Sequence, residues 1–209
     1  MLNPFAQARF LLSCAQLHQL PADELPEIAF AGRSNAGKSS ALNLICGQKQ
    51  LARVSKTPGR TQLINLFEVP GGRFADLPGY GYAKVPREVR AEWGKLIGRY
   101  LESRETLRGI VLIMDIRRPL TDYDLQMLEW TGHRNIPTHC LLTKADKLGF
   151  GAAKQQIETV RKALAPRGPG VSAQLFSSES RQGLPEAQAR LMEWLGINAD
   201  KNPVVTAGD

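Results

Sequence analysis

The chain has 209 residues, which suits one domain with short extensions. Its formal net charge of +7 favours a basic surface for nucleic acid over an anionic membrane surface, although a generic basic surface is the alternative. No apolar run reaches the length of a membrane span and residues 1–20 lack a clear signal pattern, so we expect a cytoplasmic protein that uses no membrane. The three cysteines lie far apart without metal-ligand spacing, which predicts reduced thiols.

Short apolar runs alternate with amphipathic segments along the chain. Strands are predicted at residues 28–31, 63–69, 72–76, 109–115, 137–143 and 171–176. Helices are predicted at residues 38–46, 86–103, 122–133, 150–165 and 184–195. This alternation predicts an α/β fold with a mostly parallel sheet covered on both faces. The turn at residues 70–72 indicates a hairpin, and hence one antiparallel strand.

A phosphate-binding loop is predicted between the first strand and the first helix. Residues 32–39, Gly-Arg-Ser-Asn-Ala-Gly-Lys-Ser, fit the pattern G-x-x-x-x-G-K-[ST], in which backbone N–H groups and a helix N-terminus hold phosphate. Lys38 would reach the outer phosphates and the Ser39 hydroxyl would ligate Mg²⁺. The expected nucleotide contacts are Gly32, Arg33, Ser34, Asn35, Ala36, Gly37, Lys38, Ser39 and Ser40.

A second motif, D-x-x-G, follows about forty residues after the phosphate loop, at the end of a predicted strand. An isolated D-x-P-G is a common turn, so its place in the chain carries the assignment. Here Asp76 would hold Mg²⁺ through a water, and the Gly79 N–H would contact the γ-phosphate. The expected nucleotide contacts are Asp76, Leu77, Pro78 and Gly79.

The segment Thr143-Lys144-Ala145-Asp146 follows an apolar strand and fits [NT]-K-x-D, a guanine-reading motif. The Asp146 carboxylate can accept hydrogen bonds from guanine N1–H and from its exocyclic amine. Adenine would leave the carboxylate unpaired, and such a site discriminates by roughly 10⁴-fold or more. The stem of Lys144 would pack over the base, and all four residues are expected contacts.

The last motif in chain order is Phe176-Ser177-Ser178, at the end of the last predicted strand. A backbone N–H in this place commonly meets guanine O6. Serine clusters also begin helices, so the order of the motifs carries this assignment.

The polar segment at residues 55–62 lies where a loop that senses the γ-phosphate is expected. Gly59, Arg60 and Thr61 are its expected nucleotide contacts. Thr61, or alternatively Thr57, would offer its hydroxyl to Mg²⁺. The predicted catalytic residues are Lys38, Thr61 and Gly79, and the predicted metal ligands are Ser39, Thr61 and Asp76.

With these motifs in order, the chain resembles the EngB (YihA/YsxC) family of bacterial GTPases, in the TrmE–Era–EngA-like branch. Residues 76–83, Asp-Leu-Pro-Gly-Tyr-Gly-Tyr-Ala, are its most family-specific stretch. The resemblance implies a three-layer, Ras-like P-loop domain at residues 23–197 that binds GTP and GDP with Mg²⁺. It also implies a role in assembling the large ribosomal subunit and in cell division. Residues 1–22 would be an extension packed on the domain, and residues 198–209 a flexible tail.

Slow hydrolysis is expected because Tyr80 stands where Ras-like enzymes have a water-positioning Gln. In relatives of this branch, an Asn at the place of Asn35 helps to coordinate K⁺ between the phosphates, so K⁺ stimulation is a hypothesis. The alternative is that Asn35 is a turn residue tolerant of unusual dihedrals.

Three functions compete at this level: a GTPase switch that acts on the ribosome, a P-loop phosphotransferase, and a nucleic-acid-binding module in which nucleotide is structural. We expect a monomer. The RNA-facing side is predicted to include Tyr80, Tyr82, Lys84 and the helix that follows them. The basic residues of that helix are Arg87, Arg90, Lys95 and Arg99. Interleaved Glu residues leave open a solvated helix with local ion pairs.

Overall fold

The computed structural model describes residues 3–52, 63–80 and 87–197, with side chains from residue 94 onward in the last range. Seven strands form one sheet in the order β1-β3-β4-β2-β5-β6-β7. The strands are β1 Arg9–Cys14, β2 Glu27–Gly32, β3 Ile64–Val69, β4 Gly72–Asp76, β5 Leu107–Asp115, β6 Thr138–Thr143 and β7 Val171–Leu175. Only β3 runs against the others, pairing antiparallel with β1 and β4, so the predicted hairpin and single antiparallel strand are confirmed.

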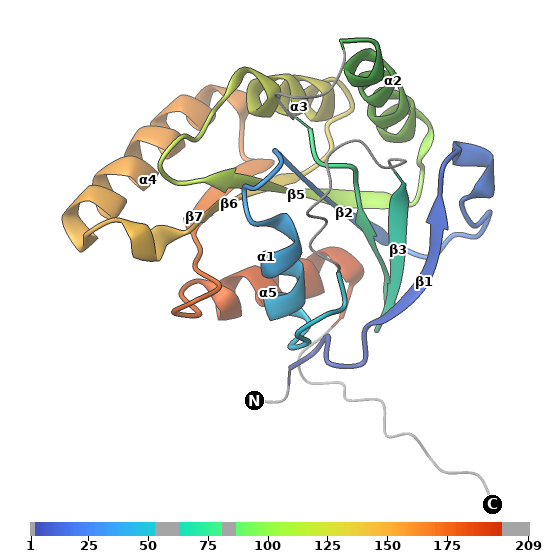
Figure 1. Ribbon diagram of the computed structural model, residues 1–209, viewed down its shortest axis with the longest axis horizontal. Helices are drawn as coiled ribbons and strands as arrows, with labels where there is room; N and C mark the ends of the chain where they lie inside the picture. The colour runs from blue at the N-terminus through green and yellow to red at the C-terminus, as the bar shows by residue number, and fades with distance from the viewer. Residues whose placement is uncertain (1–2, 53–62, 81–86, 198–209) are drawn as a thin grey trace, which may run out of the picture.

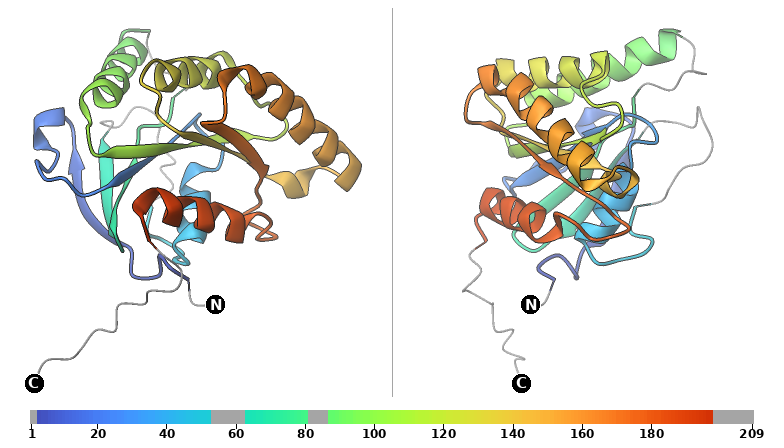
Figure 2. Two further views of the ribbon diagram at one scale, coloured as in Figure 1. Left: turned by 180° about the vertical axis from the view of Figure 1, so that it is seen from behind. Right: turned by 90° about the vertical axis from the view of Figure 1, so that its left-hand side faces the viewer.

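Helices cover both faces of the sheet and make three layers (Figure 1). They are α1 Lys38–Ile45, α2 Arg87–Ser103, α3 Asp122–His133, α4 Phe150–Leu164 and α5 Leu184–Leu195, with 3₁₀ turns η1 Leu17–Gln19, η2 Ala145–Lys147 and η3 Ala165–Arg167. Helices α1 and α5 lie on one face, and α2, α3 and α4 on the other, as a second view confirms (Figure 2). Among the described residues, no helix combines the length and apolar character that a membrane crossing needs.

Two hydrophobic cores result from the alternation of side chains along each buried strand. In β2, Ile28 and Phe30 pack into the core under α1 and α5, whereas Ala29 and Ala31 join the core under α2, α3 and α4. Because both faces are covered, β2 is buried throughout, which is typical of a central parallel strand. The ends of these strands are thereby fixed, and the loops that follow them hold the predicted motifs.

The N-terminal segment adds the edge strand β1, which the sequence analysis placed in an extension and did not predict as a strand. It pairs with β3 from Arg9↔Glu68 to Cys14↔Ile64, with an irregularity between Phe10 and Leu12. Most side chains of β1 are exposed, so neither face of the strand has to be apolar. Its sequence therefore lacks the alternation of apolar and polar residues that identifies a half-buried strand.

A buried charge cluster ties the start of β2 to the end of α2. The Glu27 side chain is fully buried and accepts hydrogen bonds from Tyr100 Oη at 2.5 Å and from Arg104 Nη2 at 2.9 Å. Burial raises the Tyr100 pKa well above its ordinary value, with the Glu27 charge as a further cause. Arg104 also donates to the carbonyl of Pro21 at 2.8 Å, so the cluster joins three segments.

Candidate nucleotide site

The predicted phosphate loop connects the end of the central strand β2 to the start of α1. Gly32 lies against β5, where a Cβ would come within 2.8 Å of the Ile113 Cβ and clash with it. Asn35 and Gly37 have left-handed backbones, with φ of 63° and 101°. Such residues are typical of loops whose successive N–H groups form an anion-binding concavity. These backbone angles are compatible with the phosphate-binding loop that the motif predicts.

Two predicted phosphate and metal residues lie in direct contact. The Lys38 ammonium forms an ion pair with the Asp76 carboxylate, and both side chains are largely buried, with 12% and 10% exposed. The contact follows from topology, because β2 and β4 are parallel neighbours and Phe30 is paired with Asp76. The first helical residue after the phosphate loop thus meets the end of β4.

Backbone hydrogen bonds join the D-x-x-G segment to the phosphate loop. The Leu77 N–H donates to the Phe30 carbonyl at 3.0 Å, and the Ser34 N–H donates to the Tyr80 carbonyl at 2.7 Å. Arg33 and Tyr80 form an isolated parallel bridge. Gly79 therefore lies between Leu77, which is bonded to β2, and Tyr80, which is bonded to the phosphate loop. A displacement of the phosphate loop would thus affect the D-x-x-G segment.

Tyr80 is buried, and its hydroxyl points toward α3. Its side chain is 7% exposed, and its hydroxyl donates to the buried Asp124 Oδ1 at 3.1 Å. Asp124 also accepts from the Thr121 N–H at 2.9 Å and from the Thr121 hydroxyl at 2.8 Å, and so caps α3. Burial raises the pKa of both Tyr80 and Asp124. The hydroxyl of Tyr80 therefore forms its hydrogen bond with α3.

Replacing Tyr80 with Phe should leave GTP turnover within about twofold of wild type, because the lost hydroxyl faces Asp124. Stability should fall by about 1 kcal/mol, the usual worth of one hydrogen bond. Steady-state hydrolysis and a denaturant titration measure the two effects. A large loss of turnover with unchanged nucleotide affinity would mean that the Tyr80 hydroxyl does position the attacking water.

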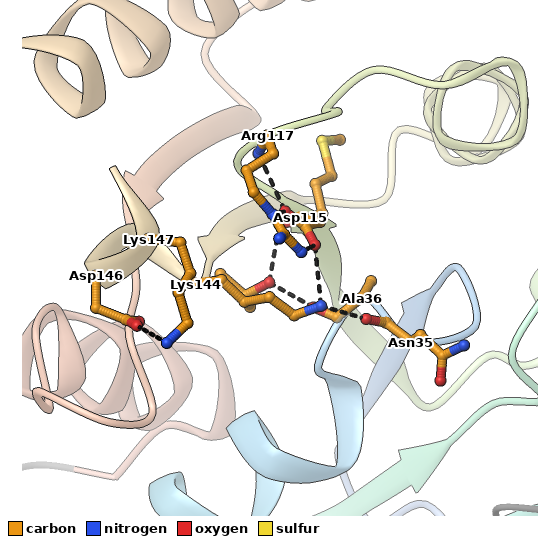
Figure 3. Close-up of polar contacts among 9 residues, drawn as sticks. Asn35, Ala36, Asp115, Arg117, Lys144, Asp146 and Lys147 are labelled. Atoms are coloured by element: carbon orange, nitrogen blue, oxygen red, sulfur yellow. Dashed lines mark hydrogen bonds and ion pairs between the residues drawn. The ribbon is translucent and has the colours of Figure 1, made fainter. Parts of the chain in front are cut away.

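The first two residues of the predicted guanine motif, Thr143 and Lys144, form hydrogen bonds with the phosphate loop. The Thr143 hydroxyl lies within hydrogen-bond distance of the Ala36 carbonyl and 3.0 Å from the Met114 carbonyl. Lys144 has a left-handed backbone, with φ of 59°. Its ammonium donates to the Asn35 carbonyl at 2.6 Å, which joins β6 to the phosphate loop (Figure 3). These contacts connect the predicted base site directly to the predicted phosphate site.

Asp115, at the end of β5, anchors Lys144 from the other side. Its carboxylate lies 2.9 Å from the Lys144 ammonium and accepts from Arg117 Nε at 2.9 Å and Nη2 at 2.6 Å (Figure 3). Burial raises the Asp115 pKa, but these hydrogen bonds outweigh it, so the pKa lies below its ordinary value. The carboxylate stays ionised and keeps the lysine stem in place. From the sequence alone, Asp115 could either line the edge of the site or have a structural role at the end of its strand.

Asp146 is held in an ionised and oriented state. The Ser177 hydroxyl donates to Asp146 Oδ1 at 2.6 Å, and the Lys147 ammonium lies 3.0 Å from Oδ2. Both contacts lower the Asp146 pKa, with the Ser177 hydrogen bond as the larger cause. An ionised carboxylate is the form that can accept two hydrogen bonds from guanine. The side chain of Ser177, which the sequence analysis did not use, thus orients the residue that is predicted to read the base.

In the last motif, residues 176–178, some backbone N–H groups already donate hydrogen bonds within the protein. The Ser177 N–H donates to the Gln182 carbonyl at 3.1 Å, and the Phe176 N–H donates to the Leu142 carbonyl at 2.8 Å. Ser178 has no hydrogen bond from its N–H among the described residues. Of the three predicted contacts, Ser178 is therefore the residue whose N–H is available to guanine O6.

The residues present fit a nucleotide with a hard cation. The buried Ser34 hydroxyl has no hydrogen-bond partner within the described part of the chain, so a polar atom of the phosphate loop is available to a ligand. The Ser39 hydroxyl and the Asp76 carboxylate are oxygen donors, which suit Mg²⁺. Thr57, Gly59, Arg60, Thr61, Tyr82 and Lys84 lie outside the described residues, and the assignments made for them stay predictions.

Comparison with known proteins decides the family. A family model described as "50S ribosome-binding GTPase" matches residues 27–144. A "Probable GTP-binding protein EngB" from Mannheimia succiniciproducens is 53% identical over 191 residues, which cover 91% of this chain and 93% of the relative. One from Xanthomonas euvesicatoria is 54% identical over 196 residues, which cover 93% and 95%. The chain belongs to the EngB family. The resemblance inferred from the motifs is confirmed, and the chain is a P-loop GTPase.

Solved structures show the same fold. The crystal structure of a probable GTP-binding protein EngB superposes with a TM-score of 0.67 at 22% identity, covering 81% of this chain and 98% of that chain. Era from Aquifex aeolicus, solved with GDP·AlF₄⁻, superposes with a TM-score of 0.62 at 19% identity, covering 82% and 57%. The predicted three-layer P-loop GTPase fold is therefore confirmed for this EngB family member.

Proposed function

We propose that the chain is a GTP-driven switch that docks on the large ribosomal subunit or its precursor, assists its assembly, and is thereby needed for normal cell division. The observation that carries the proposal is the contact network of the site. Through Ser34 and Tyr80 the phosphate loop holds the D-x-x-G segment, and through Asn35 and Lys144 it holds the guanine loop. The family description, "50S ribosome-binding GTPase", supplies the class of partner.

The charge of the chain agrees with an RNA-rich partner, since +7 exceeds what one small phosphate site needs. We further propose that the protein is a cytoplasmic monomer, with the GTP-binding domain at residues 23–197 flanked by an N-terminal extension and a C-terminal tail. Guanine readout by Asp146 argues against a general phosphotransferase. A switch, unlike a module with structural nucleotide, must bind its partner differently in its two nucleotide states.

Co-sedimentation with purified large subunits tests the switch. The protein is incubated with GDP, with a non-hydrolysable GTP analogue, or without nucleotide, at fixed salt. We expect at least tenfold tighter binding with the GTP analogue than with GDP. Equal binding in all three states would support the alternative in which the nucleotide is only structural. No binding at low salt would contradict the ribosomal role.

Hydrolysis on this chain relies on positioning and charge neutralisation. Lys38 would neutralise the outer phosphates, the Gly79 N–H would contact the γ-phosphate, and Ser39, Thr61 and Asp76 would hold Mg²⁺. When bound, Mg²⁺ supplies further neutralisation of phosphate charge. Lys38 would release Asp76 as it turns to the phosphates, which links nucleotide binding to the end of β4.

We expect slow intrinsic turnover, far below about 10 s⁻¹, a typical enzyme rate. The reason is that Tyr80 faces α3 and supplies no water-positioning amide. If Asn35 helps to bind K⁺ beside the phosphates, the rate should rise at least several-fold in K⁺ over Na⁺ at matched ionic strength, and Asn35→Ala should abolish the difference. Equal rates in the two salts would rule out the K⁺ hypothesis and leave slow turnover as it stands.

A further inference from the structure

Helices α2 and α3 lie on the face of the sheet opposite α1 and α5 (Figures 1 and 2). Residues of both helices line a groove. Its volume is about 690 Å³. Helix α2 contributes Gly94, Lys95, Gly98, Arg99, Leu101 and Glu102 to the lining. Helix α3 and its C-cap contribute Gln126, Trp130, His133 and Arg134. The groove is separate from the predicted nucleotide contacts.

The charge of the groove has one dominant sign. Lys95, Arg99 and Arg134 are exposed along it, His133 lies beside them, and Glu102 is the one carboxylate that lines it among the described residues. Within the described part of the chain, no carboxylate forms an ion pair with any of the three basic residues. Three positive charges that converge on one concave surface, without an ion-pair partner among the described residues, are complementary to a polyanion.

Two residues on the α2 side of the groove, Gly94 and Gly98, have no side chain to fill it. Gly94 and Gly98 are one turn apart, and glycine is unfavourable inside a helix. Among the described residues, a Cβ on Gly98 would meet nothing within 4 Å, and one on Gly94 would meet only Trp130 at 3.8 Å, an ordinary contact. Packing against the described part of the chain therefore does not require either glycine. Their effect is to let a partner approach the helix backbone between Lys95 and Arg99.

We propose that the α2–α3 groove binds the phosphate backbone of a structured ribosomal RNA segment. Lys95, Arg99 and Arg134 would contact phosphates, Gly94 and Gly98 would allow close approach, and Trp130 would form an apolar wall. Proteins recognise double-stranded RNA mainly through its shape and its phosphate and ribose groups, which these residue types match. The inference rests on the proposed ribosomal role, and it names the surface and the chemical group that are recognised.

Binding of the full-length protein is measured to two probes, intact large subunits and protein-free RNA from the same subunits, over a range of salt. The groove variant is Arg99→Glu/Arg134→Glu. Its control is Lys154→Glu/Lys162→Glu on α4, which makes the same change in net charge at exposed positions. We expect the groove variant to bind both probes at least tenfold more weakly, with a salt slope lower by about two. The control should stay within about threefold of wild type.

A neutral variant separates steric from electrostatic effects. Gly98→Gln fills the groove with a side chain that favours the helix, so its unfolding midpoint should not fall, while its affinity for both probes should fall at least fivefold. GTP hydrolysis without ribosomes measures whether each variant keeps its nucleotide site intact.

The outcomes separate the inference from the proposed function. Wild-type affinity for subunits in the groove variants, or equal losses in the α4 control, would overturn the inference while the ribosomal role stands. Groove-dependent binding to subunits but not to RNA would assign the groove to a ribosomal protein and also overturn it. Groove-dependent binding to RNA, without any binding to subunits, would support the groove and contradict the ribosomal role.

Discussion

Replacing Asp146 with Asn should weaken GTP and GDP binding on the order of a thousandfold, or about 4 kcal/mol, while xanthosine nucleotides bind more tightly than they do to wild type. Asn offers one acceptor and one NH₂ donor, whereas guanine presents two donors to the carboxylate. Xanthine carries a carbonyl in place of the exocyclic amine, and that carbonyl can accept from the Asn NH₂. Equilibrium titration with labelled GDP and xanthosine diphosphate measures both affinities.

Two control variants separate the carboxylate from its supports. Lys147→Ala removes an ion pair whose lysine side chain is 56% exposed, and should change GDP affinity by less than about threefold. Ser177→Ala removes the hydroxyl that orients Asp146 and lowers its pKa, and should give an intermediate loss without gain of xanthosine binding. Unchanged GDP affinity in Asp146→Asn would contradict the assignment of this loop to the base.

Replacing Arg104 with Ala should destabilise the folded protein by about 3–5 kcal/mol. The substitution leaves the fully buried Glu27 carboxylate with Tyr100 Oη as its only remaining side-chain donor among the described residues. It also leaves the Pro21 carbonyl without its donor. Urea unfolding of the nucleotide-free protein measures the loss.

The control for Arg104 is Arg108→Ala, since Arg108 is exposed and its side chain donates, among the described residues, only to the Glu105 carbonyl at 3.2 Å. Its stability should stay within about 0.5 kcal/mol of wild type. Adding Glu27→Gln to Arg104→Ala should recover part of the loss, because the double variant buries no unpaired charge. If the two substitutions are simply additive, Glu27 and Arg104 are not energetically coupled, and the interpretation of the cluster is wrong.

The parts of the site that depend on the local order of strands, loops and helices could be predicted from the sequence. Strand, loop and helix follow one another around Gly32 and Lys38, and apolar runs lead directly to Asp76 and Thr143, so chain order alone located the motifs. The contacts between motifs depend on strand order in the sheet. Asp115 reaches Lys144 because β5 and β6 are neighbours, and no local pattern states that pairing.

Other features escaped prediction for different physical reasons. The edge strand β1 exposes most of its side chains, including Phe10 and Leu11, so it lacks the alternation that identifies a strand. The direction of Tyr80 depends on Asp124, a buried carboxylate on α3, and the two residues are far apart in sequence. The pairing of Glu27 with Arg104 likewise joins residues 77 positions apart.

The central claim is that the nucleotide at this site controls docking on the large ribosomal subunit. The most direct test uses Asp146→Asn in co-sedimentation with large subunits, comparing non-hydrolysable analogues of GTP and of xanthosine triphosphate at concentrations that saturate wild type and the variant, respectively. We predict that the GTP analogue promotes docking of wild type only, and that the xanthosine analogue promotes docking of the variant to a similar extent. Docking of the variant that is equal with both analogues and without nucleotide would contradict the claim.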